Sequence, residues 1–414
     1  MTSKIVVNNI EPDAGISTVS ILGIATATKF IGDVEGAVTG NVTGDATGLS
    51  GNPSINTTGI VTATSFVPTV GQLSHRNIIV NGDMRIAQRA TTSTTAGVTT
   101  IDRFKFQYSG TDEAPTASQV DVTSGGAYDS GFRKCFKVTN GNQTGGAGTS
   151  DMISVDYNFE TQDISYSGWN YVSSSSFITL SYWVKSSVSQ NFYGRFQTID
   201  GTGQNYPFET GTLTANTWTK ITKTIPGNSN LQFDTSGATD LGLFLELSMF
   251  RGTDKTGTIA LDAWNPYGSG TTRTPDQTST WYTTNDATFE ITGVQFEVGP
   301  TATPFEHRSF GDELRRCERY YQIIKPTIGE AQNTSNIQGV LRANPPMRAT
   351  PTASILSNSN NVNLAGGGPN SVTSIGTIYY NGTTGGWAEM GGTGFTQHRN
   401  YFILGDKFAF SAEL

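Results

Sequence analysis

Glycine and small apolar residues alternate with mostly polar residues along the stretch from Gly32 to Ser50. Its even positions read Gly32, Val34, Gly36, Val38, Gly40, Val42, Gly44, Ala46, Gly48 and Ser50. A period of two predicts an extended chain, here about 60 Å long. One chain cannot bury so thin a stripe, and frequent glycine weakens an isolated strand. The pattern favours copies of the chain wound around a common axis, as in a fibre shaft. The alternative is a flexible Gly/Thr linker.

The same region carries an internal repeat. Gly23–Phe30 and Gly59–Phe66 are identical at six of eight positions. Repeats in a thin segment punctuated by glycine are typical of stacked, elongated architectures. The composition changes near residues 71–74, so we expect residues 1–76 to form one unit, an extended trimeric β shaft.

Residues 77–308 show short apolar alternations separated by clusters of Gly, Asn, Ser and Thr. This spacing is typical of antiparallel strands joined by turns, and about eight strands suit a β-sandwich or jelly roll. The segment opens with the apolar stretch Asn77–Met84. Further strands are expected at Asp102–Tyr108, Lys134–Val138, Phe177–Val184, Asn191–Ile199, Trp218–Ile225, Leu241–Phe250 and Phe289–Val298.

One amphipathic helix is expected, at Ser309–Ile323. Ser309 and Asp312 suit an N-terminal cap, and acidic residues in the first turn favour the helix start. Leu314, Cys317, Tyr320 and Tyr321 fall on one apolar face.

Residues 324–414 return to short alternations and predict a second, smaller β domain. Its strands are expected at Ile337–Arg342, Thr352–Leu356, Thr377–Tyr380, Tyr401–Leu404 and Phe408–Ala412. The fold class is therefore all-β: an N-terminal shaft, a central jelly roll or sandwich, a short connecting helix and a small C-terminal β domain.

Composition narrows the classes of partner. The formal net charge of −8 opposes nucleic-acid binding, which needs a basic face. No apolar run approaches the roughly 18 residues of a membrane span, and the first residues lack the apolar core of a signal peptide. We therefore expect synthesis and folding in a cytoplasm. Cys135 and Cys317 lie in different predicted domains, which argues against a disulfide or a cysteine metal site.

Sequence motifs for catalysis are missing. The chain has no Gly-x-Ser-x-Gly elbow, no His-Glu-x-x-His pair and no phosphate-binding Gly-x-x-x-x-Gly-Lys loop. No catalytic residue, metal or cofactor is predicted. A glycosidase needs two carboxylates on either side of a bond. Sequence alone cannot pair the scattered Asp and Glu residues, so that activity stays open.

Aromatic residues in expected loops are the best candidates for ligand contact: Trp264, Tyr267, Trp281 and Tyr282. They lie in a connection of almost forty residues between two expected strands, and loops that long are uncommon unless functional or disordered. Tryptophan and tyrosine beside Asn and Asp suit sugar rings, which have an apolar face and a hydroxyl rim. The alternative is that these rings close the ends of the sandwich or a subunit interface. If these rings do not bind the ligand, the next candidate site is in residues 324–414, around Trp387.

Three stretches resemble bacteriophage tail fibres of the marine, cyanophage-like kind. The first is the repeat around the Gly/Val stripe. The second consists of the first residues of the central segment, Asn77–Asp83, together with its last residues, 291–306. The third is Phe310–Gln322, followed by residues 346–351. The resemblance implies a homotrimeric adhesin with a virion-attachment end at its N-terminus.

The second stretch also resembles carbohydrate-binding jelly-roll modules, in which the first and last strands pair. In some of those modules an acidic residue after the Asn-Gly-Asp turn helps to hold a structural calcium. Met84 and Arg85 follow Asp83 here, so no metal is predicted.

The sequence therefore predicts a non-enzymatic fibre protein of a phage tail. Residues 1–76 would bind tail or baseplate proteins, residues 77–308 and 324–414 would recognise a host-surface glycan, and 309–323 would connect them. Two alternatives remain: a tailspike that degrades surface polysaccharide, and a purely structural head or baseplate fibre without a receptor.

Overall fold

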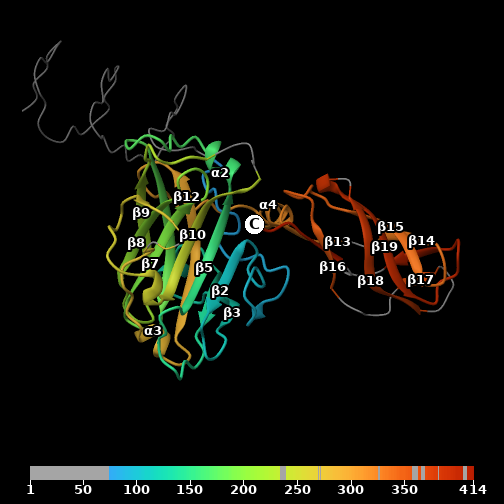
Figure 1. Cartoon of the computed structure of the whole chain (residues 1–414), viewed down its shortest axis with the longest axis horizontal. Helices are drawn as coiled ribbons and strands as arrows, with labels where there is room; N and C mark the ends of the chain where they lie inside the picture. Colours follow the sequence, from blue (N-terminus) through green and yellow to red (C-terminus); the bar gives the residue numbers. More distant parts are fainter. Residues whose placement is uncertain are drawn as a thin grey trace, which may run out of the picture. The chain divides into compact units, whose positions relative to one another are not determined.

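A computed structural model describes residues 74–233, 239–268, 270, 272–324, 327–356, 362–364, 369–380, 382–403 and 408–414. The predicted shaft and the internal repeat lie outside these residues. Within them the chain forms four antiparallel sheets and four short α-helices (Figure 1). The helices are α1 (Gly126–Asp129), α2 (Thr161–Ser165), α3 (Thr280–Thr283) and α4 (Phe310–Glu318). The predicted all-β class is confirmed.

Two six-stranded sheets form the central sandwich. The first sheet has the order β1 (Thr92–Ser93), β3 (Thr116–Asp121), β4 (Lys134–Thr139), β12 (Thr288–Val298), β6 (Phe177–Ser186) and β9 (Thr219–Pro226). The second has the order β11 (Asn265–Pro266), β8 (Gln204–Thr212), β7 (Asn191–Thr198), β10 (Leu241–Arg251), β5 (Met152–Glu160) and β2 (Phe104–Ser109). Figure 1 shows strands of the second sheet side by side. The arrangement is the jelly-roll-like sandwich that the alternation predicts.

The inner faces of the two sheets share one apolar core. On β6 the inward side chains are Ile178, Leu180, Tyr182 and Val184, all buried. Their alternation with polar neighbours is the period of a strand with one face in the core. Phe196 of β7 stacks on Phe296 of β12 with ring centroids 4.9 Å apart. This contact joins the two sheets near the centre of the sandwich.

All seven strands expected between Asp102 and Val298 are present to within a few residues. The expected strands do not include β1, β3, β5, β8 and β11. Strand β5 nevertheless alternates Ser154, Asp156 and Asn158 with apolar residues, which is the period of a strand with one face in a core. Strand β8 contains Pro207, a residue that interrupts the pattern of a regular strand.

The opening stretch Asn77–Met84 runs beside β12 without forming a regular strand. Ile78 N donates to Phe296 O at 2.9 Å, and Val294 N donates to Gly82 O at the same distance. A Cβ on Gly82 would lie 2.1 Å from Val294 O, so only glycine permits this approach. The beginning and end of the sandwich are thus adjacent, as the resemblance to carbohydrate-binding modules implies.

Helix α4 begins as expected and ends early. The Ser309 hydroxyl accepts a hydrogen bond from Asp312 N at 3.1 Å, which caps the helix. The expected end at Ile323 is wrong, because the chain becomes extended at Tyr321 and pairs with the strand at Phe408–Ser411. Cys317 and Tyr320 are buried on the expected apolar face.

The C-terminal residues form a small sheet and a closed barrel. The sheet has the order β13 (Tyr321–Ile324), β21 (Phe408–Ser411) and β16 (Thr352–Ile355). The barrel has the order β14 (Thr327–Ala331), β15 (Asn336–Arg342), β19 (Gly385–Thr393), β18 (Pro369–Tyr380), β17 (Val362–Leu364) and β20 (Asn400–Ile403). None of the helices described above has the length and apolar character that crossing a membrane requires.

Candidate functional site

Two of the four predicted ligand-binding rings lie in the core. Trp281 is 0% exposed and Tyr282 is 1% exposed. Trp281 Nε1 donates to Thr288 O at 3.0 Å, and the Tyr282 hydroxyl donates to Asp151 Oδ2 at 2.8 Å. Helix α3 turns both rings inward, so neither offers a face to a ligand. The expectation is corrected for Trp281 and Tyr282, which stabilise the sandwich.

The other two predicted rings are partly exposed. The Trp264 indole donates from Nε1 to Pro226 O at 2.8 Å, and its ring centroid lies 5.1 Å from that of Tyr206. Tyr267 lies beside the Arg195 guanidinium, 5.7 Å from the ring centroid. Trp264 therefore closes part of the core, while Tyr267 borders a charged cluster. The structure does not bring the four predicted rings onto one surface.

The charged cluster lies on the outer face of the second sheet. Glu246 on β10 is opposite Asp156 on β5 and opposite Arg195 on β7. Glu246 Oε2 accepts from Arg195 Nε at 2.9 Å, and Oε1 accepts from Arg251 Nε at 3.1 Å. All four side chains are buried. Asn205 Nδ2 donates to Arg273 O at 2.8 Å, which holds the segment after β10 against the same face.

The two carboxylates of this cluster are shifted in opposite directions. Burial, reinforced by the neighbouring Glu246, raises the pKa of Asp156 to about 7. Burial also acts to raise the pKa of Glu246, but Arg195 and Arg251 hold it below its ordinary value. Carboxylates with pKa values driven apart can serve as acid and base. Here both oxygens of Glu246 are already held by guanidinium groups, and both arginines lie on strands of the same sheet, so these contacts join β7 to β10.

The barrel carries a row of exposed apolar side chains, which we name the outer strip: Tyr379, Trp387, Val340, Ile328 and Phe402. Tyr379 and Val340 both lie opposite Trp387 in register, and Ile328 lies opposite Phe402. Four of the five are between 42% and 56% exposed, and Trp387 is partly exposed. The strip crosses five neighbouring strands, a span of about 19 Å at the usual strand spacing. Exposed apolar residues gathered in this way mark interaction surfaces more often than scattered ones do.

A hollow of about 660 Å³ lies at the tyrosine–tryptophan end of the outer strip. The Tyr379 and Trp387 ring centroids are 4.9 Å apart, with an interplanar angle of 49°. The described lining residues are Val340, Arg342, Ala343, Asn344, Pro346, Tyr379, Thr384, Gly385, Gly386 and Trp387. The volume lies within the range of small-molecule sites, and rings converge there with an arginine and an amide.

Two glycines shape this hollow. Gly385 has φ +99°, and a Cβ there would lie 2.1 Å from Leu341 O. A Cβ on Gly386 would lie 2.4 Å from Tyr379 O. The strands of β15, β19 and β18 can approach closely only because these positions lack side chains. The floor of the hollow is therefore backbone, with the rings of the strip rising beside it.

A second hollow, of about 550 Å³, lies on the outer face of the first sheet and is lined partly by Trp183, Phe132, Phe305 and His307. Phe132 is buried, and the rings of Phe132, Phe305 and His307 contact one another at centroid distances of 4.9 to 5.4 Å. Phe132 therefore offers no face to a ligand. Trp183, on the outer face of β6, is partly exposed.

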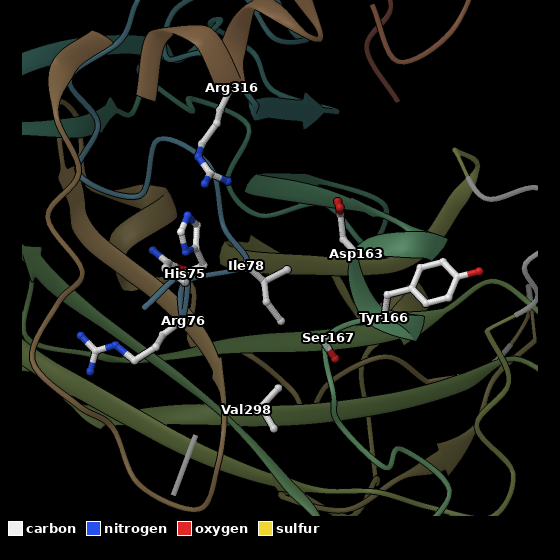
Figure 2. Close-up of a pocket in the computed structure, with 9 residues that line it drawn as sticks. His75, Arg76, Ile78, Asp163, Tyr166, Ser167, Val298 and Arg316 are labelled. Atoms are coloured by element: carbon white, nitrogen blue, oxygen red, sulfur yellow. The ribbon is translucent and has the colours of Figure 1, made fainter. Parts of the chain in front are cut away.

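A third hollow, shown in Figure 2, lies where the opening stretch meets α2 and α4. It measures about 210 Å³ and is lined by residues that include His75, Asp163, Tyr166 and Arg316. The Arg316 side chain extends from α4 towards His75, whereas the Tyr166 ring points away (Figure 2). Burial raises the pKa of Asp163 to about 6, and Glu160 adds to the shift. This hollow is smaller than usual ligand sites, and we assign it to the junction between these elements.

Metal ligands do not gather anywhere in the described ranges: no group of three His, Cys, Asp or Glu residues there could hold an ion. Asp83, the last residue of the Asn-Gly-Asp turn, pairs with Arg85 Nε at 2.8 Å.

No family model and no curated protein matches the chain. Among solved structures, the enzymatically active domain of tailspike protein 4 from bacteriophage CBA120 aligns at 9% identity and a TM-score of 0.28, over 54% of this chain and 21% of that one. The N-terminal cellulose-binding domain of β-1,4-glucanase C from Cellulomonas fimi aligns at 10% identity and a TM-score of 0.24, over 53% and 99%. A family 11 carbohydrate-binding module of Clostridium thermocellum aligns at 13% identity and a TM-score of 0.23, over 49% and 91%. All three alignments are distant.

Sequence reasoning ranked Trp387 second and did not single out Tyr379 or Arg342. One signal was available: Tyr379–Tyr380 and Gly385–Trp387 place aromatic residues beside glycines on both sides of a turn. Which of these side chains face outward depends on the closure of the barrel, which a local pattern does not reveal.

Proposed function

We propose that this protein is a fibre of a phage tail that recognises a glycan on the host surface through the outer strip and its hollow. The observation that carries the proposal is the ring pair of exposed Tyr379 and partly exposed Trp387, 4.9 Å apart, beside polar groups in a hollow of about 660 Å³. The fibre role itself rests on the sequence resemblance described above.

The chemistry of the strip suits a sugar. A pyranose has an apolar C–H face that stacks on an aromatic ring and a rim of hydroxyl groups that needs hydrogen-bond partners. Tyr379 and Trp387 supply rings, and Asn344 supplies an amide at the rim of the same hollow. Val340, Ile328 and Phe402 continue the apolar surface across the barrel. A glycan of several units would lie across the strands.

Residues 1–76 attach the protein to tail or baseplate proteins in this proposal, and three copies assemble around the Gly/Val stripe. Once one site of the trimer has bound, the other two sites are held close to the same surface at a high effective concentration. Weak contacts with single sugars therefore combine into a much stronger overall binding. The proposed location is the virion tail, after synthesis in the host cytoplasm. Trp264 and Tyr267 remain secondary candidates for contact, since both are partly exposed.

A tailspike that degrades polysaccharide is the alternative of a different class. Its best candidate pair is Asp156 and Glu246, which are opposite each other in register. Both are buried, and two arginines occupy the Glu246 carboxylate. These contacts argue against hydrolysis by this pair.

The test removes single rings and measures adsorption to host cells and binding to a glycan array. By analogy with stacking on nucleic-acid bases, each ring contributes about 1–3 kcal/mol, so Trp387→Ala and Tyr379→Ala should each weaken binding several-fold or more. Tyr166→Ala is the matched control, because Tyr166 is 74% exposed and lies outside the strip. Folded variants that adsorb like the wild type would overturn the proposal. A change of oligomeric state with normal glycan binding would identify the strip as a contact between copies.

A further inference from the structure

We infer that the hollow beside Tyr379 and Trp387 takes a sugar that carries an anionic group, with Arg342 as the residue that selects it. This inference rests on the proposed glycan-binding function and specifies the class of glycan.

The charge of the hollow is the first observation. Arg342 is the one ionisable cation among its described lining residues, and none of those residues is acidic. The chain as a whole carries 34 acidic and 26 basic residues. A positively charged hollow in an acidic protein is an electrostatic feature that favours an anionic ligand.

The position of Arg342 is the second observation. It follows Val340 by two residues on β15, so both side chains lie on the outer face of the barrel. Its cross-strand partner is Gly385, which has no side chain to cover the guanidinium. Arg342 is exposed and forms no ion pair with any residue that the structure describes. Glu389, which lies opposite Gln338 on β19, accepts a hydrogen bond from Gln338 Nε2 at 3.3 Å.

Together these features provide two kinds of contact, one for the sugar ring and one for its acidic group. A guanidinium binds a carboxylate through two parallel, charge-assisted hydrogen bonds, which are stronger than its hydrogen bonds to neutral hydroxyl groups. Trp387 and Tyr379 stack on the apolar face of the ring, and Arg342 pairs with its acidic substituent. An unpaired surface arginine is ordinary by itself; here it lines the same hollow as two exposed rings.

The test uses the full-length protein with three defined probes: oligogalacturonate, oligoalginate and α-2,8-oligosialate, each compared with its carboxyl-reduced counterpart of equal length. We expect at least one acidic oligosaccharide to bind about tenfold or more tightly than its reduced form, as is typical of a charge-assisted contact. Arg342→Gln should abolish this preference, so that the acidic and the reduced forms bind equally. Arg399→Gln, an exposed arginine of the same domain that does not line the hollow, should retain it. Sulfated galacto-oligosaccharides of equal length distinguish a carboxylate from a sulfate.

Two outcomes overturn the inference. One is equal binding of acidic and reduced forms, and the other is a preference that survives Arg342→Gln. If only neutral sugars bind and Trp387→Ala weakens that binding, the proposed function stands and the acidic specificity fails. If no probe, acidic or neutral, binds and a broad glycan array is also negative, both fail.

Discussion

Asp156 and Glu246 lie directly opposite each other on β5 and β10, yet their carboxyl groups respond oppositely to the same buried surroundings. Glu246 receives two guanidinium groups, whereas Asp156 accepts a hydrogen bond from the Ser154 hydroxyl at 2.8 Å. Two anions at such close range in a low dielectric are unfavourable. One of them is stabilised as the anion, and the other retains its proton to a higher pH.

This relationship predicts how stability depends on pH. Burial raises the pKa of Asp156 to about 7 in the folded protein, whereas the unfolded value is about 3.9. Between these values the folded state binds a proton that the unfolded state has released, so this group's contribution to stability falls as pH rises from about 4 to about 7. Asp156→Asn should remove up to about 1.4 kcal/mol per pH unit of that slope. Urea unfolding at pH 4.5, 5.5 and 7 measures it. The exposed control Asp129→Asn should keep the wild-type slope, and an unchanged slope in Asp156→Asn would contradict the prediction.

Breaking the buried ion pair should cost far more than breaking an exposed one. Arg195 and Glu246 are both buried, so Arg195→Ala leaves a carboxylate short of one partner and should destabilise the fold by about 3–5 kcal/mol. The exposed pair Lys134–Asp121, at 2.6 Å, provides the control. Lys134→Ala should lower the free energy of unfolding by about 0–1 kcal/mol. Equal losses in the two variants would show that the cluster does not stabilise the covered face.

Substitution of Trp281 and of Trp387 should have opposite effects on stability and on glycan binding. Trp281→Ala removes a ring that is 0% exposed and should destabilise the sandwich by about 3–5 kcal/mol. Glycan binding per folded molecule should remain unchanged. Trp387→Ala should do the reverse, with reduced binding and a melting temperature close to that of the wild type. Thermal unfolding and binding titrations on the same samples measure both effects. Loss of binding in folded Trp281→Ala would return that ring to the candidate site.

The Gly/Val stripe predicts the oligomeric state. Full-length protein should scatter light with a mass three times that of the 44.2 kDa chain, because one chain cannot bury the stripe. Removal of residues 1–76 should prevent assembly onto virions without unfolding the sandwich. A folded monomer of the full chain would contradict the trimer, and loading of the truncated protein onto fibre-less particles would contradict the attachment role.

Short-range patterns in the sequence determined most of the architecture. Strand β6 alternates Ile178, Leu180, Tyr182 and Val184 with polar residues, and such a period specifies both an extended chain and the side that enters a core. Ser309 and Asp312 specified where α4 begins, because capping depends only on neighbouring residues. The end of α4 was not predictable in the same way, since a strand at Phe408–Ser411, far along the chain, competes for Tyr321.

Only the tertiary structure decided which aromatic side chains face solvent. Trp281 lies among Ser, Thr and Asp residues, and Trp387 lies beside glycines and threonines. Helix α3 nevertheless turns Trp281 into the core, whereas barrel closure leaves Trp387 partly exposed on the outside. The same holds for Asp156 and Glu246, which are ninety positions apart in the chain and become neighbours through the register of β5 and β10. Local periodicity determines the conformation of a segment, whereas exposure and the pairing of distant side chains depend on how sheets pair and close.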